Sequence, residues 1–409
     1  MQGAKPSMEK SESVSKSKLP GINRIESIDI MRGLVMVIMA LDHARAYFHY
    51  GSFFINPTDM ETTTPVLFFT RFITHYCAPV FVFLAGTSAF MVSRKKSKKE
   101  LFKFLFTRGI WLIFLEFIVN NLIWTFDPTY SKIVLQVIWA IGFSMVCLSF
   151  LIYFPKKIIF LFGIILVAGH NLLDGIVFNG QGAKDIIWYL LHQRHFIDSP
   201  DFRFVFAYPV IPWVGLMALG FCFGILYEKE FGQSHRKKWL LALGIGLTVL
   251  FFILRGLNKY GDLVPWSQQK NTVYTVLSFF NVTQYPPSLD YLLITIGPTL
   301  ILLYLLEYFK PKITDFLLVF GKVPLFFYFL HVFVIHAFAV LGLWISGEDW
   351  HRMILTAEVF QKKSLLDYGY SLWLVYAVWI VVIFLLYPLS KKYMYYKANN
   401  KNKWWLSYL

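Results

Sequence analysis

Ionisable residues interrupt an apolar segment near the N-terminus, residues 28–48, which otherwise has the character of a membrane-spanning helix. Burying such a group in a membrane costs several kcal/mol unless it faces a protein interior or a water-filled cavity. This segment is therefore the first candidate for a functional site. Its ionisable residues are Asp29, Arg32, Asp42, His43 and Arg45.

His43 is the residue of this segment that can exchange a proton near neutral pH. Free histidine has a pKa of about 6.5, which suits a general base that removes a proton from a hydroxyl or an amine. The ring could instead accept an acyl group and form a covalent intermediate. We expect Asp42, the adjacent residue, to orient His43 and to bias its charge state.

Arginines near His43 are candidates for binding anionic groups of a substrate. A guanidinium binds phosphate or carboxylate through two parallel hydrogen bonds. Ten residues separate Arg32 from His43, which corresponds to about three helical turns and roughly 16 Å of rise. We therefore assign Arg32 to the phosphates of a cytosolic donor, and Arg45 and Arg71 to the substrate nearer the histidine.

The composition identifies the chain as a polytopic membrane protein. Of its 409 residues, 57% are hydrophobic and 15% are charged, whereas a soluble domain has about 25% charged residues. The excess of 39 Lys and Arg over 24 Asp and Glu is expected to mark cytoplasmic loops, so no nucleic-acid partner is predicted. The three cysteines have neither a disulfide nor a metal-ligand spacing.

Ten apolar segments are long enough to cross a bilayer, which takes roughly 17–25 residues each. They predict an all-α integral membrane protein with about ten transmembrane helices. Lys and Arg are concentrated before the first helix and after every second one, so both termini are predicted to be cytoplasmic. The segments are 28–48, 66–92, 102–124, 133–154, 157–173, 204–227, 239–257, 289–309, 316–344 and 371–389.

A single membrane domain of residues 26–395 is predicted between two cytoplasmic tails, 1–25 and 396–409. The first tail is polar and rich in Ser and Lys, so we expect it to be disordered. It has no apolar core followed by a cleavage site, which a signal peptide would require. The long outer loops carry aromatic residues that suit either sugar recognition or anchoring at the membrane interface.

Two other predicted helices place histidines near the depth of His43. At the rise of an α-helix, His43 and His331 lie roughly 22 Å from the cytoplasmic ends of their helices, and His75 roughly 14 Å from the outer end of its helix. We therefore expect His75 and His331 to line the site, with Arg71 one turn from His75. A structural hydrogen bond between helices is the alternative for His331 and for His336. No paired ligand spacing favours zinc, and no metal is expected.

Several motifs follow one another along the predicted membrane domain. Together they resemble the bacterial membrane family related to heparan-α-glucosaminide N-acetyltransferase, over nearly the whole domain. The spacing between Arg32 and His43 also resembles the wider family of membrane acyltransferases that acylate surface glycans. The motifs are Ser27–Gly33, Asp42–His43, Thr70–Ser88, Tyr208–Gly215, Tyr285–Leu289 and Gly321–His331.

The resemblance implies an acyltransferase of the cell inner membrane, which moves an acetyl or other acyl group from cytosolic acetyl-CoA to an amine or hydroxyl of an extracytoplasmic carbohydrate. It implies that His43 is catalytic and Arg32 essential. The lysosomal heparan enzyme has asparagine at the position of His43 and a catalytic histidine further on, near His49 of this chain. A homodimer is one possible oligomeric state. The alternative from another class is a proton-coupled transporter with a buried His and Arg relay, although we find no paired repeats of the kind common in transporters.

Overall fold

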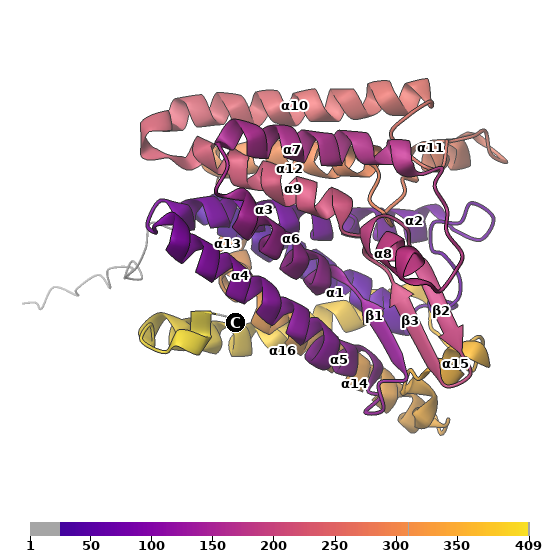
Figure 1. The fold of residues 1–409 in the computed structure, drawn as a ribbon. Coiled ribbons are helices and arrows are strands. Elements are labelled where there is room, and N and C mark those ends of the chain that lie inside the picture. Colours follow the sequence, from indigo (N-terminus) through magenta and orange to yellow (C-terminus); the bar gives the residue numbers. More distant parts are fainter. Residues whose placement is uncertain (1–24, 310, 408–409) are drawn as a thin grey trace, which may run out of the picture.

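The computed structural model describes residues 25–309 and 311–407, which form a bundle of long helices with a small sheet at one end (Figure 1). Most of these residues are helical, as predicted. The predicted tail of residues 1–25 lies outside the described residues except for Ile25. The helices are α1 (Glu26–Phe48), α2 (Pro65–Thr74), α3 (Cys77–Ser93), α4 (Lys98–Leu115), α5 (Asn121–Thr125), α6 (Val137–Leu151), α7 (Lys156–Gly169), α8 (Ala183–Leu191), α9 (Ile211–Phe223), α10 (Gln233–Leu257), α11 (Thr272–Phe280), α12 (Leu289–Tyr308), α13 (Ile313–Lys322), α14 (Pro324–Ile345), α15 (Ala357–Gln361) and α16 (Leu372–Asn399).

Three short strands form a sheet that the prediction of an all-α protein did not include. The central strand β3 (Phe202–Phe206) pairs in parallel with β1 (Lys132–Leu135) and antiparallel with β2 (His195–Ser199). The predicted helices 133–154 and 204–227 therefore begin in β1 and β3. β1 contains the β-branched residues Ile133 and Val134, and β3 contains Val205 among three Phe residues, all of which favour extended backbone. Hydropathy alone does not distinguish such a strand from the first turn of an apolar helix.

Among the described residues, six helices are long and apolar enough to cross a membrane. This confirms a multi-pass membrane protein, whereas the count of ten and the cytoplasmic orientation of the termini are not confirmed. Two predicted spans are shorter helices, and the predicted span 316–344 is divided into α13 and α14 where Pro324 begins a new helix. The six helices are Pro65–Ser93, Lys156–Leu173, Gln233–Leu257, Leu289–Tyr308, Pro324–Ile345 and Leu372–Asn399.

An interruption between α2 and α3 places polar groups inside the bundle. Pro79 lacks the N–H that would bond to the carbonyl of His75 in a continuous helix. The hydroxyl of Tyr291 on α12 donates to that carbonyl instead, at 2.8 Å. Thr74 and Cys77, on either side of the interruption, both line the cavity that is described below.

Paired glycines lie at the closest contacts between helices. At each pair, an added Cβ atom would collide with the backbone or side chains of the other helix, so only glycine allows this separation. The pairs are Gly33 with Gly321 (α1 and α13), Gly86 with Gly220 (α3 and α9), Gly109 with Gly142 (α4 and α6), Gly163 with Gly215 (α7 and α9), and Gly244 with Gly297 (α10 and α12).

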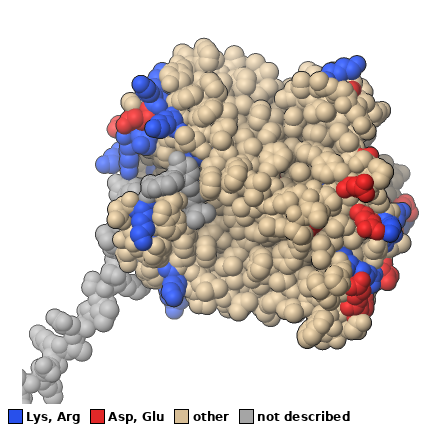
Figure 2. All heavy atoms as spheres, turned by 60° about the horizontal axis from the view of Figure 1, so that its bottom comes forward, with Lys and Arg blue, Asp and Glu red and all other residues tan. Residues whose placement is uncertain are grey.

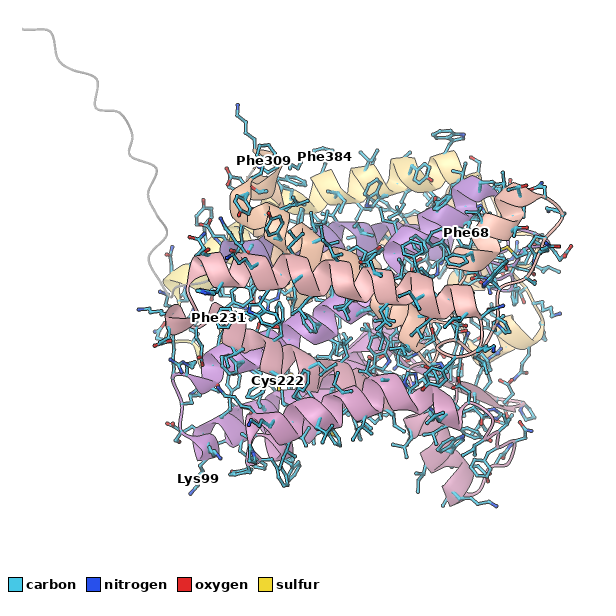
Figure 3. All side chains as sticks on the ribbon, turned by 90° about the horizontal axis from the view of Figure 1, so that it is seen from above. Phe68, Lys99, Cys222, Phe231, Phe309 and Phe384 are labelled. Atoms are coloured by element: carbon cyan, nitrogen blue, oxygen red, sulfur yellow. The ribbon has the colours of Figure 1, made fainter. Side chains whose placement is uncertain are left out.

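The face of the molecule in Figure 2 has two charged ends and a middle with few charges. Lys and Arg predominate at the left end of this view, and both signs of charge occur at the right end. Figure 3 places Lys99 at the first end, with α10 running along the bundle. Phe309 and Phe384, also labelled there, are 70% and 67% exposed. An apolar middle surface is what contact with lipid requires.

Candidate active site

A small cavity lies between α1, α2, α3, the start of α6, α14 and the loops that precede α9 and α12. Its volume is about 40 Å³, room for about three water molecules. Polar and aromatic side chains from segments far apart in the chain meet at its wall. The lining residues are Met39, Asp42, His43, Arg71, Thr74, Cys77, Ala78, Gln136, Val137, Tyr208, Gln284, Tyr285 and Tyr328.

His43 on α1 forms a hydrogen-bonded pair with His331 on α14. Nδ1 of His43 lies 2.7 Å from Nε2 of His331, and the two rings are nearly parallel. Nδ1 of His331 lies 2.7 Å from the carbonyl oxygen of Phe327, which can only accept a hydrogen bond. A neutral His331 therefore carries its proton on Nδ1 and accepts, at Nε2, the Nδ1–H of His43. This arrangement leaves Nε2 of His43 unprotonated.

Aromatic side chains hold the His43 ring in this orientation. Trp124 on α5 and Tyr328 on α14 contact the ring edge-on, with centroid separations of 4.8 and 5.9 Å. The indole N–H of Trp124 donates to the hydroxyl of Tyr328 at 3.2 Å. A hydroxyl that accepts one hydrogen bond can still donate its own proton to another acceptor. His43 is thus packed from two sides while it still lines the cavity.

Two arginines hold the carboxylate of Asp42 at the cavity wall. Arg45 donates from Nε and Nη2 to Oδ1, at 3.2 and 3.0 Å, and Arg71 donates from Nη1 to Oδ2 at 2.7 Å. Arg71 also donates to the hydroxyl of Thr74 at 3.0 Å and to the side-chain oxygen of Gln284. This clamp joins α1 to α2 and to the loop that precedes α12.

The structure brings five of the predicted site residues together. Asp42, His43 and Arg71 line the cavity, Arg45 bonds to Asp42, and His331 bonds to His43. We expected Asp42 to orient His43, but the carboxylate is engaged by the two arginines. The contact that orients the ring comes from His331, which is completely buried.

Arg32 lies on α1 about three turns before His43, and its side chain reaches α3. It donates to Asp29 and to the carbonyl of Leu84, both at 3.1 Å, and to the hydroxyl of Ser88. Its side chain is 19% exposed. Arg32 therefore joins α1 to α3 and can still meet a ligand from that end of the bundle, but it does not line the cavity.

Three other histidines are not among the residues that line the cavity. His75 is buried beside Tyr291, with ring centroids 5.4 Å apart. His336 bonds to two backbone carbonyls, at 3.0 and 2.8 Å, which matches the structural alternative considered for it. His49 follows the end of α1, where burial and the nearby charge of Arg45 hold the pKa of its ring below the ordinary value.

Two glutamines at the cavity were missed because isolated neutral polar residues carry little signal in a hydropathy pattern. Gln284 bonds to Arg71, and Gln136 immediately precedes α6. Gln136 is positioned by Glu116, which is completely buried in a π-helical turn and accepts the backbone N–H groups of Gln136 and Trp139 at 3.2 and 2.9 Å. Glu116 thus supplies the acceptor for the start of α6.

Tyr208 and Tyr285 were present in the motifs but received no role. Their hydroxyl oxygens lie 3.2 Å apart, and both side chains line the cavity. The motifs Tyr208–Gly215 and Tyr285–Leu289 are the signal that could have found them. Among the residues that the structure describes, no group of three His, Cys, Asp or Glu side chains is placed to hold a metal ion.

The bundle and its cavity define a multi-pass membrane protein with a small internal site lined by polar and aromatic side chains. The chain belongs to the family of the heparan-alpha-glucosaminide N-acetyltransferase catalytic domain, whose model matches residues 24–255, more than half of the chain. The match confirms the resemblance and makes the protein a membrane acetyltransferase by family. It includes Asp42, His43 and Arg71 but ends before His331. No curated protein matches the chain significantly.

Proposed function

We propose that this protein transfers an acetyl group from acetyl-CoA to an amine or hydroxyl of a carbohydrate on the outer side of the cell inner membrane. The observation that carries the proposal is the contact of 2.7 Å between Nδ1 of His43 and Nε2 of His331 beside the cavity, from which we infer that Nε2 of His43 is unprotonated. A general base needs such a lone pair within reach of the reacting proton. The family match supports acetyl transfer and gives no support to a transporter.

In the proposed reaction, Nε2 of His43 removes a proton from the acceptor as its nitrogen or oxygen bonds to the thioester carbon. The carbon–sulfur bond then breaks, and the protonated His43 returns the proton to the departing thiolate. The products are the acetylated carbohydrate and CoA with a free thiol, so atoms and charge balance. The positive charge on His43 is stabilised because its Nδ1–H donates to His331.

Tyr328 is our candidate for stabilising the negative charge that develops on the carbonyl oxygen. It lines the cavity, and its hydroxyl, which accepts from Trp124, can still donate its own proton. Removing one donor of this kind typically lowers kcat by about 10²–10³. We therefore expect Tyr328→Phe to lose activity on this scale without a comparable rise in KM, when initial rates are measured against acceptor concentration.

The two substrates are proposed to enter from opposite ends of the bundle. The phosphates of acetyl-CoA would bind near Arg32, which is partly exposed, and its thioester would extend along α1 toward His43. The acceptor would approach from the other end, toward Arg71. The cavity has room for about three water molecules, which is less than a whole sugar requires.

The test is acetyl transfer from radiolabelled acetyl-CoA in membranes that contain the wild type, His43→Ala or His49→Ala. We expect His43→Ala to lose transfer and His49→Ala to keep it, because His49 does not line the cavity. Undiminished transfer by His43→Ala would refute the proposed base. Mass spectrometry after incubation with the donor alone tests the covalent route. An acetyl group found on His43 would show that transfer passes through an acetyl-histidine intermediate and would refute direct transfer.

A further inference from the structure

An open apolar groove of about 450 Å³ lies on the outside of the bundle between α1, α2 and α16. Val66, Phe69 and Ile73 are among the large apolar side chains that α2 exposes there. In a multi-pass membrane protein such a surface is covered by hydrocarbon. The lining residues are Leu41, Pro65, Val66, Phe69, Thr70, Ile73 and Tyr376.

Different faces of the same helical turns line this groove and the cavity. Leu41 of the groove precedes Asp42 of the cavity, and on α2 the groove residue Thr70 precedes Arg71. Ile73 is likewise followed by a cavity residue, Thr74. The ion pair between Asp42 and Arg71 therefore belongs to the layer of side chains that separates the groove from the cavity.

Two features indicate an amphipathic ligand: a polar group within the groove, and an excess of positive charge that is buried close to its wall. The hydroxyls of Thr70 and Tyr376 lie 2.6 Å apart inside the otherwise apolar wall. One turn beyond Leu41 on α1 is Arg45, which shares the single carboxylate of Asp42 with Arg71. Two arginines and one carboxylate leave net positive charge, which an anionic group would neutralise.

We propose that the acceptor is a carbohydrate joined through phosphate to a membrane lipid, and that its hydrocarbon chain lies in this groove. The chain would hold the sugar beside the layer that Asp42 and Arg71 form, and the phosphate would meet the excess charge at Arg45. This assignment rests on the proposed acetyl transfer and names the class of acceptor for the same site. Lipid tethering also confines the acceptor to the membrane plane and so raises its effective concentration.

The test compares two esters of glucosamine 1-phosphate, farnesyl and methyl, which share the sugar and the charge and differ in the chain. Both are offered with labelled acetyl-CoA to protein in lipid vesicles. Ile73→Trp fills the groove, and Val249→Trp, on the exposed face of α10, is the matched control. For each variant we compare kcat/KM for the farnesyl ester with kcat/KM for the methyl ester. We expect this ratio to be roughly tenfold lower in Ile73→Trp than in the control, because overpacking a site typically costs enough free energy for a tenfold change.

A second measurement does not depend on transfer. A farnesyl ester with a photoreactive chain should crosslink to residues 65–73 or to Tyr376, and unlabelled farnesyl ester should compete. An unchanged ratio in Ile73→Trp, or crosslinks confined to other helices, would overturn the lipid-linked acceptor. If the wild type acetylates neither ester while the crosslinks still fall in the groove, acetyl transfer to this sugar is refuted and the lipid site stands.

Discussion

Replacing His331 with leucine tests whether His43 works as a positioned base. His331 is completely buried, and leucine fills a similar volume without a polar atom. The substitution removes the acceptor for the Nδ1–H of His43, which lies 2.7 Å away. Because His43 becomes positively charged during the reaction, the lost hydrogen bond is one to a charged group and is worth about 1.5–3 kcal/mol. A loss of this size in the transition state lowers kcat by roughly 10- to 150-fold.

Initial rates of labelled acetyl transfer, normalised to folded protein by size-exclusion chromatography, measure this effect. His331→Gln should restore part of kcat, because its amide oxygen can accept the same proton, and neither variant should greatly change KM. His351→Leu, which replaces an exposed histidine, is the control for an unrelated loss of a ring. A kcat for His331→Leu within roughly twofold of the wild type would refute the positioning of His43 by His331.

Three further predictions concern stability. Asp42→Ala leaves two arginines without their carboxylate and should lower the free energy of unfolding by about 3–5 kcal/mol, which thermal unfolding in detergent would show as a lower Tm. A second substitution, Arg71→Met, should partly restore the Tm. Gly33→Ala drives a Cβ atom into the backbone of α13 and should cost about 1–3 kcal/mol, whereas Gly246→Ala, whose added Cβ would meet nothing within 4 Å, should not destabilise in the same assay. Burial by itself would raise the pKa of Asp127, but hydrogen bonds from nearby Ser and Thr groups outweigh it and lower this pKa below its ordinary 3.8. The stability that the ionised Asp127 contributes is therefore present above pH 3.8 and is lost as the pH falls through the lowered pKa. The protection of the amides of residues 127–131, measured relative to the intrinsic exchange rate at each pH, should therefore fall only in acid, and Asp127→Asn should remove this dependence.

Depth along a helix could be predicted from the sequence, whereas the direction of a side chain around the helix axis could not. The rise per residue is constant, so His43, His75 and His331 could be placed at similar depths. His331 meets His43, but His75 points to Tyr291 instead. Each helix can rotate about its axis without changing depth, and only packing against its neighbours selects one rotation.

Broken helices show the same limit for the fold. The apolar segments were located from hydropathy, but β1 and β3 begin two of them, and Pro324 divides another. An apolar strand and an apolar helix have the same transfer free energy to a first approximation, so composition does not separate them. The strands form because each finds a partner elsewhere in the chain, as Lys132 does with Arg203.

The sequence by itself determined that this is a multi-pass membrane protein, that α1 carries the functional residues to examine first, and that the chain resembles an acetyltransferase family. It could do so because lipid contact restricts composition and every ionisable group inside a membrane needs a partner. Only the tertiary structure decided which partners those are. It joined His43 to a ring 288 positions away and gave the carboxylate of Asp42 to Arg45 and Arg71. Such choices depend on helix rotation and loop path, which are properties of the whole packed bundle.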